Sequence, residues 1–432
     1  MVRIQSSRSK INGTVRCPSS KSYSHRAFVI SSLAEGKSII KNPLYSRDTL
    51  ATISSCRALG ALIRQDNNIL NVNGGHDFRA PDDVINSDNS GTTIRLMTSV
   101  ASLVKSGSTV LTGDESLRKR PMQPLLDSLN ELGVRAFSTK EDGAPPLVVM
   151  GGGIKGGSTA LDGSLSSQFV SSLLISCVYA DSNVIIQIKG DQVSRPYIES
   201  TIETMKAFGV SVHNEEFKEY LLQPTWYKPT IFSVPADLSS AALLLSAGLL
   251  IGEDVTVIGI DFSLPQADSD IVNIIGGMDG QIQVDHNKGE IRVQGTERLS
   301  GGEFNLSDSP DLLPVVAILA LKARSPVKIT GIGHARLKES DRVANIASQL
   351  TKLGATIKED KNGLLISAPK TLKNASLESF NDHRLFMAFT VAALLTNKST
   401  VAGVESVEVS YPNFIQDLTG LGAKLKPTVD RE

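Results

Sequence analysis

Apolar residues gather in six helix-length runs along the chain, and each run begins with a polar segment. A β-type segment follows each run, as STVLTG does at 108–113. Runs that are apolar on nearly all sides are typical of helices buried in a core. We therefore predict six core helices, each leading into a strand. The predicted helices span residues 24–36, 90–107, 166–180, 238–252, 310–323 and 383–397.

A short phrase with a central glycine recurs along the chain. In physical terms a helix ends, glycine takes the left-handed position just past it, and a strand begins. The spacing is about 72 residues, one sixth of the 432-residue chain. The phrase reads RALGALI at 57–63, NELGVRA at 130–136, KAFGVSV at 206–212, TKLGATI at 351–357 and TGLGAKL at 418–424, with a degenerate copy, GGMDGQI, at 276–282. Its predicted helices include 47–60, 120–133, 195–209 and 340–354.

Six such units predict an α/β protein of two similar domains, because six units exceed what one hydrophobic core holds. Each domain takes three units in the order helix, strand, helix, strand, strand. The boundary is expected in the proline-bearing stretch 224–235. The opening strand, 2–15, precedes the first unit and is expected to pair with the C-terminal half. This gives an N-terminal lobe of residues 20–234 and a discontinuous C-terminal lobe of residues 1–19 and 235–432.

Composition removes several classes of function. The 44 Lys and Arg residues nearly balance 45 Asp and Glu residues, so no overall cationic field attracts nucleic acid or an anionic membrane. Aromatic residues are 5% of the chain, which argues against a base-stacking surface. Three scattered Cys fit neither a disulfide framework nor a zinc cluster. No apolar run approaches the roughly 20 residues that span a bilayer, and no signal peptide is recognisable, so we predict a soluble, cytoplasmic protein.

The predicted helix starts carry the candidate chemistry. A helix start offers unpaired N–H groups and a partial positive charge, so it attracts anions. An arginine there opposes the helix dipole unless an anion is present, and its guanidinium binds phosphate or carboxylate through two parallel hydrogen bonds. The repetition of this feature predicts a ligand with several anionic groups, held between two domains. The arginines are Arg26, Arg95, Arg120, Arg195, Arg342 and Arg384.

Other polar residues at the same starts have a simpler explanation. Ser, Asp and Asn are ordinary N-cap residues, and this reading holds for most single serines here. The segment SDSPD at 307–311 is compatible with capping and with function alike. GGGIKGGS at 151–158 is glycine-rich but lacks the GK[ST] ending of a phosphate-binding loop, so a turn is the better interpretation.

Eight motifs, taken together and in order, resemble the signature of the EPSP synthase family, the 3-phosphoshikimate 1-carboxyvinyltransferases. They lie between residues 19 and 414, and LKESDR combined with NDHRLFMAF is the most specific pair. The resemblance implies the enolpyruvyl transferase fold, an inside-out α/β barrel whose two similar domains each hold three βαβαββ units and close around the substrates. The motifs are SSKSYSHRA, NSGTTIR, RKRPM, SSQF, SRPY, SPDLLP, LKESDR and NDHR.

The resemblance also implies a reaction in aromatic amino acid biosynthesis. The 5-hydroxyl of shikimate 3-phosphate attacks C2 of phosphoenolpyruvate while C3 is protonated to a methyl group. The resulting tetrahedral ketal loses inorganic phosphate and gives 5-enolpyruvylshikimate 3-phosphate. Neither a metal nor an organic cofactor is required. The expected partners are these two small substrates, with no nucleic acid and no membrane, and we expect a monomer.

Site residues follow from the matching motifs. The resemblance assigns the proton of the 5-hydroxyl to Asp311, proton transfer at the methyl carbon to Glu339, and protonation of the leaving phosphate to Lys21. The residues implied for shikimate 3-phosphate are Lys21, Ser22, Arg26, Ser166, Ser167, Gln168, Ser194, Tyr197, Asp311 and Lys338. Those implied for phosphoenolpyruvate are Lys21, Asn89, Gly91, Arg120, Gln168, Arg342 and Arg384.

Two positions depart from the family pattern. Val409 stands where many members carry a lysine, so one contact to phosphoenolpyruvate is missing or supplied elsewhere. Leu96 stands where a proline is usual. Gly91 is retained, and the resemblance then implies inhibition by glyphosate.

Two alternatives belong to different classes. A UDP-N-acetylglucosamine enolpyruvyl transferase has the same fold but typically opens with Lys-Asn and uses a loop cysteine. Here Ser22 follows Lys21, and RKRPM holds no cysteine. A non-catalytic anion-binding repeat scaffold would explain the arginines, but it would not need Asp311 and Glu339.

Overall fold

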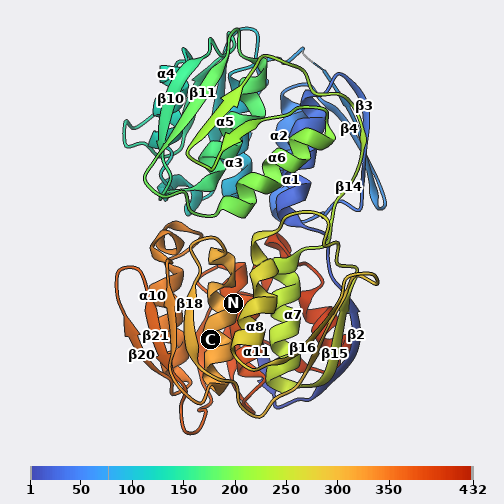
Figure 1. Cartoon of the computed structure of the whole chain (residues 1–432), viewed down its shortest axis with the longest axis vertical. Helices are drawn as coiled ribbons and strands as arrows, with labels where there is room; N and C mark the ends of the chain where they lie inside the picture. Colours follow the sequence, from blue (N-terminus) through green and yellow to red (C-terminus); the bar gives the residue numbers. More distant parts are fainter. Residues whose placement is uncertain (1, 76, 430–432) are drawn as a thin grey trace. The chain divides into compact units, whose positions relative to one another are not determined.

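The computed structural model describes residues 2–75 and 77–429. The chain divides into two compact units (Figure 1). The N-terminal unit comprises Ser19–Pro235, and the C-terminal unit comprises Met1–Pro18 together with Ala236–Glu432. The chain therefore passes between the units twice, once after Pro18 and once after Pro235.

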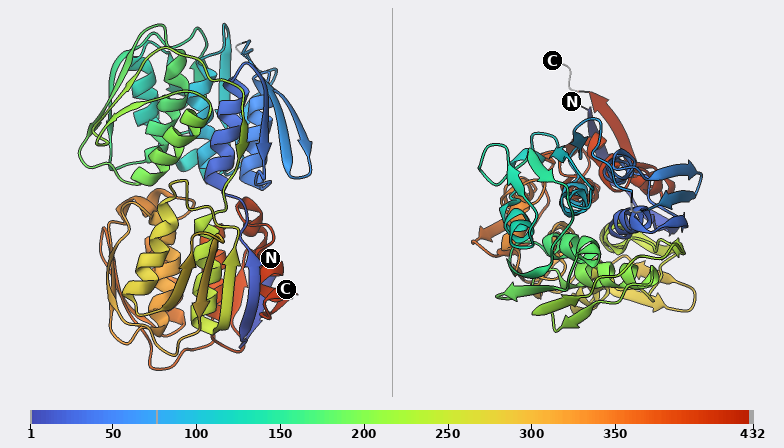
Figure 2. Two further views of the ribbon diagram at one scale, coloured as in Figure 1. Left: turned by 45° about the vertical axis from the view of Figure 1, so that its right-hand side comes forward. Right: turned by 90° about the horizontal axis from the view of Figure 1, so that it is seen from above.

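Both units repeat one motif, βαβαββ, three times. Each motif forms a four-stranded sheet in the part of the chain that the structure describes. In the sheet β10-β11-β13-β12, for example, the first two strands are parallel, and the last strand of the motif lies antiparallel between the second and the third. In each unit the helices lie inside and the strands outside (Figure 2). This architecture confirms the repeat predicted from the sequence.

The N-terminal unit contains the sheets β14-β3-β5-β4, β6-β7-β9-β8 and β10-β11-β13-β12. Its helices are α1 (Lys21–Leu33), α2 (Arg47–Ala58), α3 (Gly91–Ala101), α4 (Gln123–Glu131), α5 (Ser167–Ser176) and α6 (Arg195–Ala207). Its strands are β3 (Gly36–Lys41), β4 (Leu62–Asp66), β5 (Ile69–Gly74), β6 (Ile85–Asn86), β7 (Ser108–Thr112), β8 (Ala136–Ser138), β9 (Leu147–Met150), β10 (Gly157–Asp162), β11 (Val184–Lys189), β12 (His213–Glu215), β13 (Glu219–Leu222) and β14 (Ile231–Ser233).

The C-terminal unit contains the sheets β16-β17-β15-β2, β18-β19-β21-β20 and β22-β23-β1-β24. Its helices are α7 (Leu238–Ile251), α8 (Ile271–Gly277), α9 (Leu313–Leu319), α10 (Arg342–Lys352), α11 (His383–Ala393) and α12 (Phe414–Gly420). Its strands are β1 (Val2–Ser7), β2 (Ile11–Arg16), β15 (Gly252–Ile258), β16 (Gln281–Asp285), β17 (Glu290–Gln294), β18 (Gly302–Asn305), β19 (Val327–Thr330), β20 (Thr356–Glu359), β21 (Leu364–Ser367), β22 (Ser376–Glu378), β23 (Thr400–Ala402) and β24 (Lys424–Val429).

The recurring glycines perform the predicted role. Each of the five follows a helix and has a positive φ, from 82° at Gly209 to 111° at Gly60. In the degenerate copy, Asp279 takes that position after α8, with φ 56°. Asp is one of the few non-glycine residues that tolerate this conformation. The geometry of the turn is therefore kept where the glycine is lost.

The opening segment forms two strands where one was expected. β1 lies antiparallel between β23 and β24, whereas β2 runs parallel to β15 in another sheet. Both belong to the C-terminal unit, as the pairing prediction required. The first motif in turn takes its missing strand from β14, which runs parallel to β3. Three sheets thus close only when strands far apart in sequence meet.

The core helices are buried on all sides, as their sequences predict. Every residue of α7 is buried. Burying one Leu or Ile side chain contributes about 1.5–3 kcal/mol, so such helices stabilise each unit strongly. The predicted helix 310–323 is shorter than expected: α9 is flanked by 3₁₀ turns at Pro310–Leu312 and Ala320–Lys322.

Within the described residues, no helix is both long enough and apolar enough to cross a membrane.

Candidate active site

Arg342 is the centre of a charged cluster in the C-terminal unit. It is the first residue of α10, and its side chain is 1% exposed. Its Nε donates to Asp382 Oδ2 at 2.8 Å and its Nη1 to Asp311 Oδ1 at 2.7 Å. Its Nη2 donates to Glu339 Oε2 at 2.6 Å. One buried guanidinium therefore joins three carboxylates from three separate segments.

Asp311 is shared among three cations. Besides Arg342, Arg384 Nη2 lies 2.7 Å from Asp311 Oδ2, and Lys338 Nζ lies 4.0 Å from Oδ1. Burial raises the pKa of Asp311, but Arg384, Lys338 and Arg342 outweigh it and hold that pKa well below its usual value. Asp311 is consequently a carboxylate throughout the physiological pH range.

The cluster has a buried base and a partly exposed rim. The side chains of Arg342 and Asp382 are 1% and 0% exposed. Those of Asp311, Glu339 and Lys338 keep 13%, 14% and 28% of their surface. Burial lowers the pKa of Arg342, whereas Asp382, Glu339 and Asp311 raise it and prevail. The rim is where a small anionic ligand can make contact.

Asp382 was not among the predicted ligand-binding residues. It is the N-cap of α11, where Oδ1 accepts from the Arg384 amide at 3.0 Å. The Asp382 carboxylate therefore holds the Arg342 guanidinium with Oδ2 and caps the helix that begins with His383 and Arg384 with Oδ1.

Asp268 is a second residue that was not predicted from the sequence. Burial raises the pKa of Asp268 to about 7, and neighbouring Asp311 adds to that rise.

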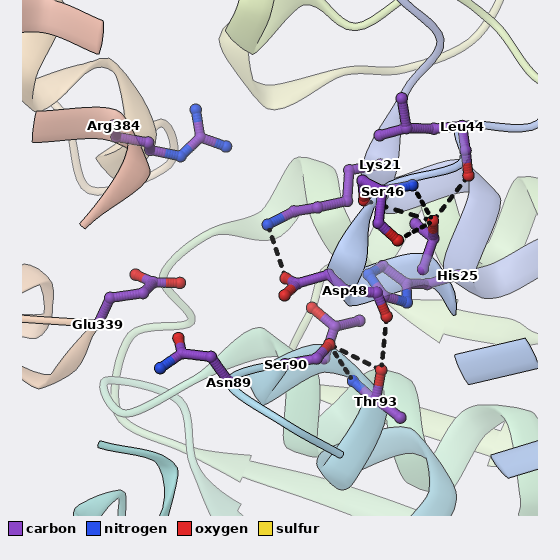
Figure 3. A network of polar contacts seen from close by, with 12 residues as sticks. Lys21, His25, Leu44, Ser46, Asp48, Asn89, Ser90, Thr93, Glu339 and Arg384 are labelled. Carbon is purple, nitrogen blue, oxygen red and sulfur yellow. Dashed lines mark hydrogen bonds and ion pairs between the residues drawn. The ribbon is translucent and has the colours of Figure 1, made fainter. Parts of the chain in front are cut away.

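In the N-terminal unit, Lys21 begins α1, and its ammonium forms an ion pair with Asp48 on α2 (Figure 3). The Nζ to Oδ2 distance is 3.1 Å, and the two side chains are 12% and 5% exposed. Asp48 holds the ammonium in place without fully enclosing it. Asp48 could be placed from the sequence only in the first turn of a predicted helix, without any sign that it pairs with Lys21.

A second cationic side chain, that of Arg120, lies at the start of α3. Arg120 Nη2 donates to Asn89 Oδ1 at 2.9 Å, and Asn89 Nδ2 donates to Asp114 Oδ2 at 2.6 Å. Asn89 thus aims Arg120 at the first turn of α3, where Gly91 stands. Arg120 itself lies before α4 and not within it, because that helix begins only at Gln123.

The close approach of the Arg120 guanidinium explains why position 91 is a glycine. A Cβ added at this glycine would lie 2.7 Å from Arg120 Nη1 and 3.3 Å from Arg95 Nη1. Gly91→Ala is expected to push the Arg120 guanidinium off Asn89 and to raise the KM for an anion bound there about tenfold, the worth of roughly one charged hydrogen bond. Steady-state kinetics checks this. Gly75→Ala, where nothing lies within 4 Å, is the matched control. Equal KM values in the two variants would contradict the prediction.

The third set of predicted residues lies at the starts of α5 and α6. Ser166 is the N-cap of α5, and Ser167 is buried beside it. Gln168 Oε1 accepts from Arg95 Nη1 at 2.6 Å. Ser194 precedes α6 with φ 57°, a left-handed conformation that costs a non-glycine residue about 1–2 kcal/mol. The Ser194 side chain makes no capping hydrogen bond to α6.

Arg26 is used in a way that the sequence did not predict. Its Nε donates to Thr201 Oγ1 at 2.7 Å, and its Nη2 donates to the carbonyl of Tyr197 at 2.8 Å, both on α6. Its Nη1 donates to the Ser22 carbonyl at 2.9 Å. The guanidinium therefore joins α1 to α6 and retains one further N–H on each terminal nitrogen.

The two departures from the family pattern lie in buried positions. Val409 ends a 3₁₀ turn, Val404–Val409, and is 7% exposed. Leu96 lies within α3 and is 1% exposed. Both side chains pack as core residues.

The fold defines the class of protein: an α/β transferase of the enolpyruvyl transferase fold. An EPSP synthase from Acinetobacter baumannii superposes with a TM-score of 0.82 at 27% identity, over 99% of both chains. The enolpyruvyl transferase NikO from Streptomyces tendae gives 0.79 at 17% identity, over 100% of this chain and 99% of that chain, and shows the fold alone.

The sequence comparisons narrow the class to one family. The profile of EPSP synthase (3-phosphoshikimate 1-carboxyvinyltransferase) matches residues 5–418. The 3-phosphoshikimate 1-carboxyvinyltransferase of Nitrosopumilus maritimus is 44% identical over 97% of this chain and 98% of its own. That of Methanocaldococcus jannaschii is 40% identical over 96% and 97%. The chain belongs to the EPSP synthase family, and it transfers the enolpyruvyl group of phosphoenolpyruvate to shikimate 3-phosphate.

Proposed function

We propose that the charged residues of both units act on one pair of substrates. Phosphoenolpyruvate carries a phosphate and a carboxylate, and shikimate 3-phosphate carries one of each. The residues proposed for phosphoenolpyruvate are Lys21, Asn89, Gly91, Arg120, Gln168, Arg342 and Arg384. Those proposed for shikimate 3-phosphate are Lys21, Ser22, Arg26, Ser166, Ser167, Gln168, Ser194, Tyr197, Asp311 and Lys338.

One observation carries the proposal: Asp311 sits among Arg342, Arg384 and Lys338 on the rim of the cluster. In the free protein these cations hold the Asp311 pKa well below its usual value, so Asp311 is a weak base. When the substrate anions take hydrogen bonds from Arg384 and Lys338, that stabilisation falls and the basicity of Asp311 rises. Asp311 then accepts the proton of the 5-hydroxyl as the oxygen attacks C2.

Glu339 and Lys21 complete the proposed proton transfers. Glu339 in its carboxylic acid form delivers its proton to C3 during addition. The resulting carboxylate, which accepts from Arg342 at 2.6 Å, takes a proton back from the methyl carbon during elimination. Lys21 protonates the leaving phosphate oxygen, and Asp48 keeps its ammonium oriented at 3.1 Å. General acid–base steps of this kind contribute about 10²–10⁴-fold each. The arginines add electrostatic stabilisation of the ketal and of the departing phosphate.

The two units are proposed as the two lobes of the enzyme. All residues in the proposed set belong to one chain, and the monomeric state stays a prediction. The cytoplasmic location stays a prediction.

Phosphate release tests the proposed roles. The protein is expected to release phosphate from phosphoenolpyruvate with shikimate 3-phosphate and not with UDP-N-acetylglucosamine. Glu339→Gln is expected to lower kcat by about 10²–10⁴-fold, because the amide cannot shuttle a proton. Its carbonyl still accepts from Arg342, so affinity for shikimate 3-phosphate should change by less than about threefold.

Glu378→Gln is the matched control. Glu378 lies in the same unit and pairs with Arg3, with 36% of its side chain exposed. The Glu378→Gln variant should have the kcat of the wild type. An unchanged kcat in Glu339→Gln would remove Glu339 from the mechanism. Including glyphosate in the wild-type assay checks the inhibition that the retained Gly91 implies.

A further inference from the structure

A chain of buried polar side chains links three helices of the N-terminal unit. His25 Nδ1 on α1 lies 2.7 Å from Thr52 Oγ1 on α2. Thr52 Oγ1 lies 2.7 Å from Thr93 Oγ1 on α3, and Thr93 Oγ1 lies 2.7 Å from Ser90 Oγ at the N-cap of that helix. All four residues are 0% exposed. We call them the hydroxyl chain.

The direction of the hydrogen bonds is determined by counting protons. The one proton of the Thr93 hydroxyl goes to Ser90 Oγ or to the Asp48 carbonyl oxygen, and in both cases Thr93 accepts from Thr52. Thr52 has then used its one proton and accepts from His25 Nδ1. This assigns His25 as the neutral tautomer that carries its hydrogen on Nδ1. Burial lowers the pKa of His25, and the cations Lys21 and Arg26 lower it further, in agreement with a neutral ring.

The hydroxyl chain connects the helix starts that carry the anion-binding groups. Thr93 Oγ1 also lies 3.3 Å from the carbonyl of Asp48, the residue that pairs with Lys21. Ser90 accepts from the Thr93 amide at 3.2 Å and so fixes the first turn of α3 next to Gly91. Three short hydrogen bonds therefore set the position of the Lys21 start relative to the Gly91 start.

Stability alone does not require this arrangement. Apolar side chains of the same volume would pack the three helices about as well, because a net hydrogen bond contributes little once both partners are buried. Directional bonds instead select one register, since an O–H···O contact tolerates only tenths of an ångström. We propose that His25, Thr52, Thr93 and Ser90 are positioning residues that hold the starts of α1 and α3 in the geometry required to bind phosphoenolpyruvate. This inference rests on the proposed assignment of Lys21 and Gly91 to that substrate.

The first test compares two Thr→Val variants on one helix. Thr93→Val removes the central hydroxyl of the chain. Thr98→Val removes an equally buried hydroxyl on α3 that donates only to the Ile94 carbonyl of its own helix, at 2.6 Å. We expect Thr93→Val to raise the KM for phosphoenolpyruvate about tenfold and that for shikimate 3-phosphate less than about twofold. Thr98→Val should leave both unchanged. Equal KM values for phosphoenolpyruvate in the two variants, or an equal rise for both substrates, would overturn the inference.

The second test compares two variants of His25, one that keeps an N–H donor and one that removes it. The variant with the donor shows whether a loss of function comes from the missing hydrogen bond or from a protein that does not fold. Asn carries an N–H donor at the same number of bonds from Cα as His Nδ1, whereas Leu carries none. His25→Asn is expected to keep the KM for phosphoenolpyruvate within about twofold of the wild type, and His25→Leu to raise it about tenfold. If His25→Leu matches His25→Asn, the hydroxyl chain has no positioning role. Nitrogen NMR of His25 should show the Nδ1–H tautomer from pH 5 to pH 8, and a protonated ring in that range would refute the assignment.

A separate variant distinguishes failure of the inference from failure of the residue assignment. Arg120→Ala removes a proposed phosphoenolpyruvate ligand without touching the hydroxyl chain. An unchanged KM for phosphoenolpyruvate in Arg120→Ala would reject the assignment of the α3 start. A raised KM in Arg120→Ala with an unchanged KM in Thr93→Val would reject only the positioning role.

Discussion

Replacing Arg342 with methionine is expected to abolish measurable turnover and to lower the free energy of unfolding by about 3–5 kcal/mol. Methionine fills a similar volume, so the loss is electrostatic. Without the guanidinium, Arg384 and Lys338 still neutralise Asp311, but Glu339 and the 0% exposed Asp382 lose the Arg342 cation. Uncompensated buried carboxylates cost far more than a lost surface pair. Chemical denaturation followed by circular dichroism, together with phosphate release, checks both parts.

The control is Arg336→Met in the same unit. Arg336 pairs with Asp341 and Glu359, but its side chain is 22% exposed. Its loss should cost less than about 1 kcal/mol and leave turnover intact. Similar losses of unfolding free energy in the two variants would show that the Arg342 cluster is not specially dependent on its central cation.

The stability difference between wild type and Arg342→Met should shrink as the pH falls. In the wild type the Asp311 pKa is depressed on folding. It therefore contributes stability above its unfolded value, about 3.9, and loses it only below that pH. In the variant Asp311 keeps Arg384 and Lys338, whereas Glu339 and the buried Asp382 lose the Arg342 cation. Burial then favours protonation of these two carboxylates, so the penalty is relieved as the pH falls. Denaturation at pH 5 and pH 8 measures the difference.

The sequence predicted the sixfold repeat better than it predicted which strands pair in each sheet. The glycine phrase marks the ends of α2, α4, α6, α10 and α12 because a left-handed residue past a helix favours glycine. The degenerate copy was recognised although Asp279 replaces that glycine. Period alone could not show that the segment 2–15 divides into strands of two sheets. Local propensity does not encode partners hundreds of residues away.

The candidate residues were predicted as single charges, and the structure adds their partners. Arg342 and Asp311 were both proposed as ligands, yet their contact of 2.7 Å spans 31 positions of sequence. Asp382 is an ordinary N-cap by its sequence, and its ion pair with Arg342 depends on α10 and α11 both packing against α9. In the sequence, His25 differs from other buried residues only through its charged neighbours, Lys21 and Arg26. Its partner Thr52 carries no signal in the sequence, because a buried threonine on a helix is unremarkable.

Asp311→Asn is expected to separate chemistry from binding. An amide cannot accept the 5-hydroxyl proton, so kcat should fall by about 10²–10⁴-fold. Asparagine has nearly the same shape, and its carbonyl still accepts from Arg342, so the cluster should keep its geometry. Asp308→Asn, three residues earlier in the same segment, is the control and should retain the wild-type kcat. Wild-type turnover in Asp311→Asn would assign the base role elsewhere.

The affinity of the same variant for phosphoenolpyruvate should change in the opposite direction. In the wild type Arg384 Nη2 lies 2.7 Å from Asp311 Oδ2, and an incoming anion must compete with that carboxylate. The neutral amide removes the competitor and leaves the cations in place, so the dissociation constant should fall, by roughly tenfold if one charged hydrogen bond of about 1.4 kcal/mol is released. Titration calorimetry with shikimate 3-phosphate present measures it. A higher dissociation constant would mean that Asp311 orients Arg384 for binding. The Arg384–Asp311 ion pair of the free protein would then be the arrangement that binds phosphoenolpyruvate.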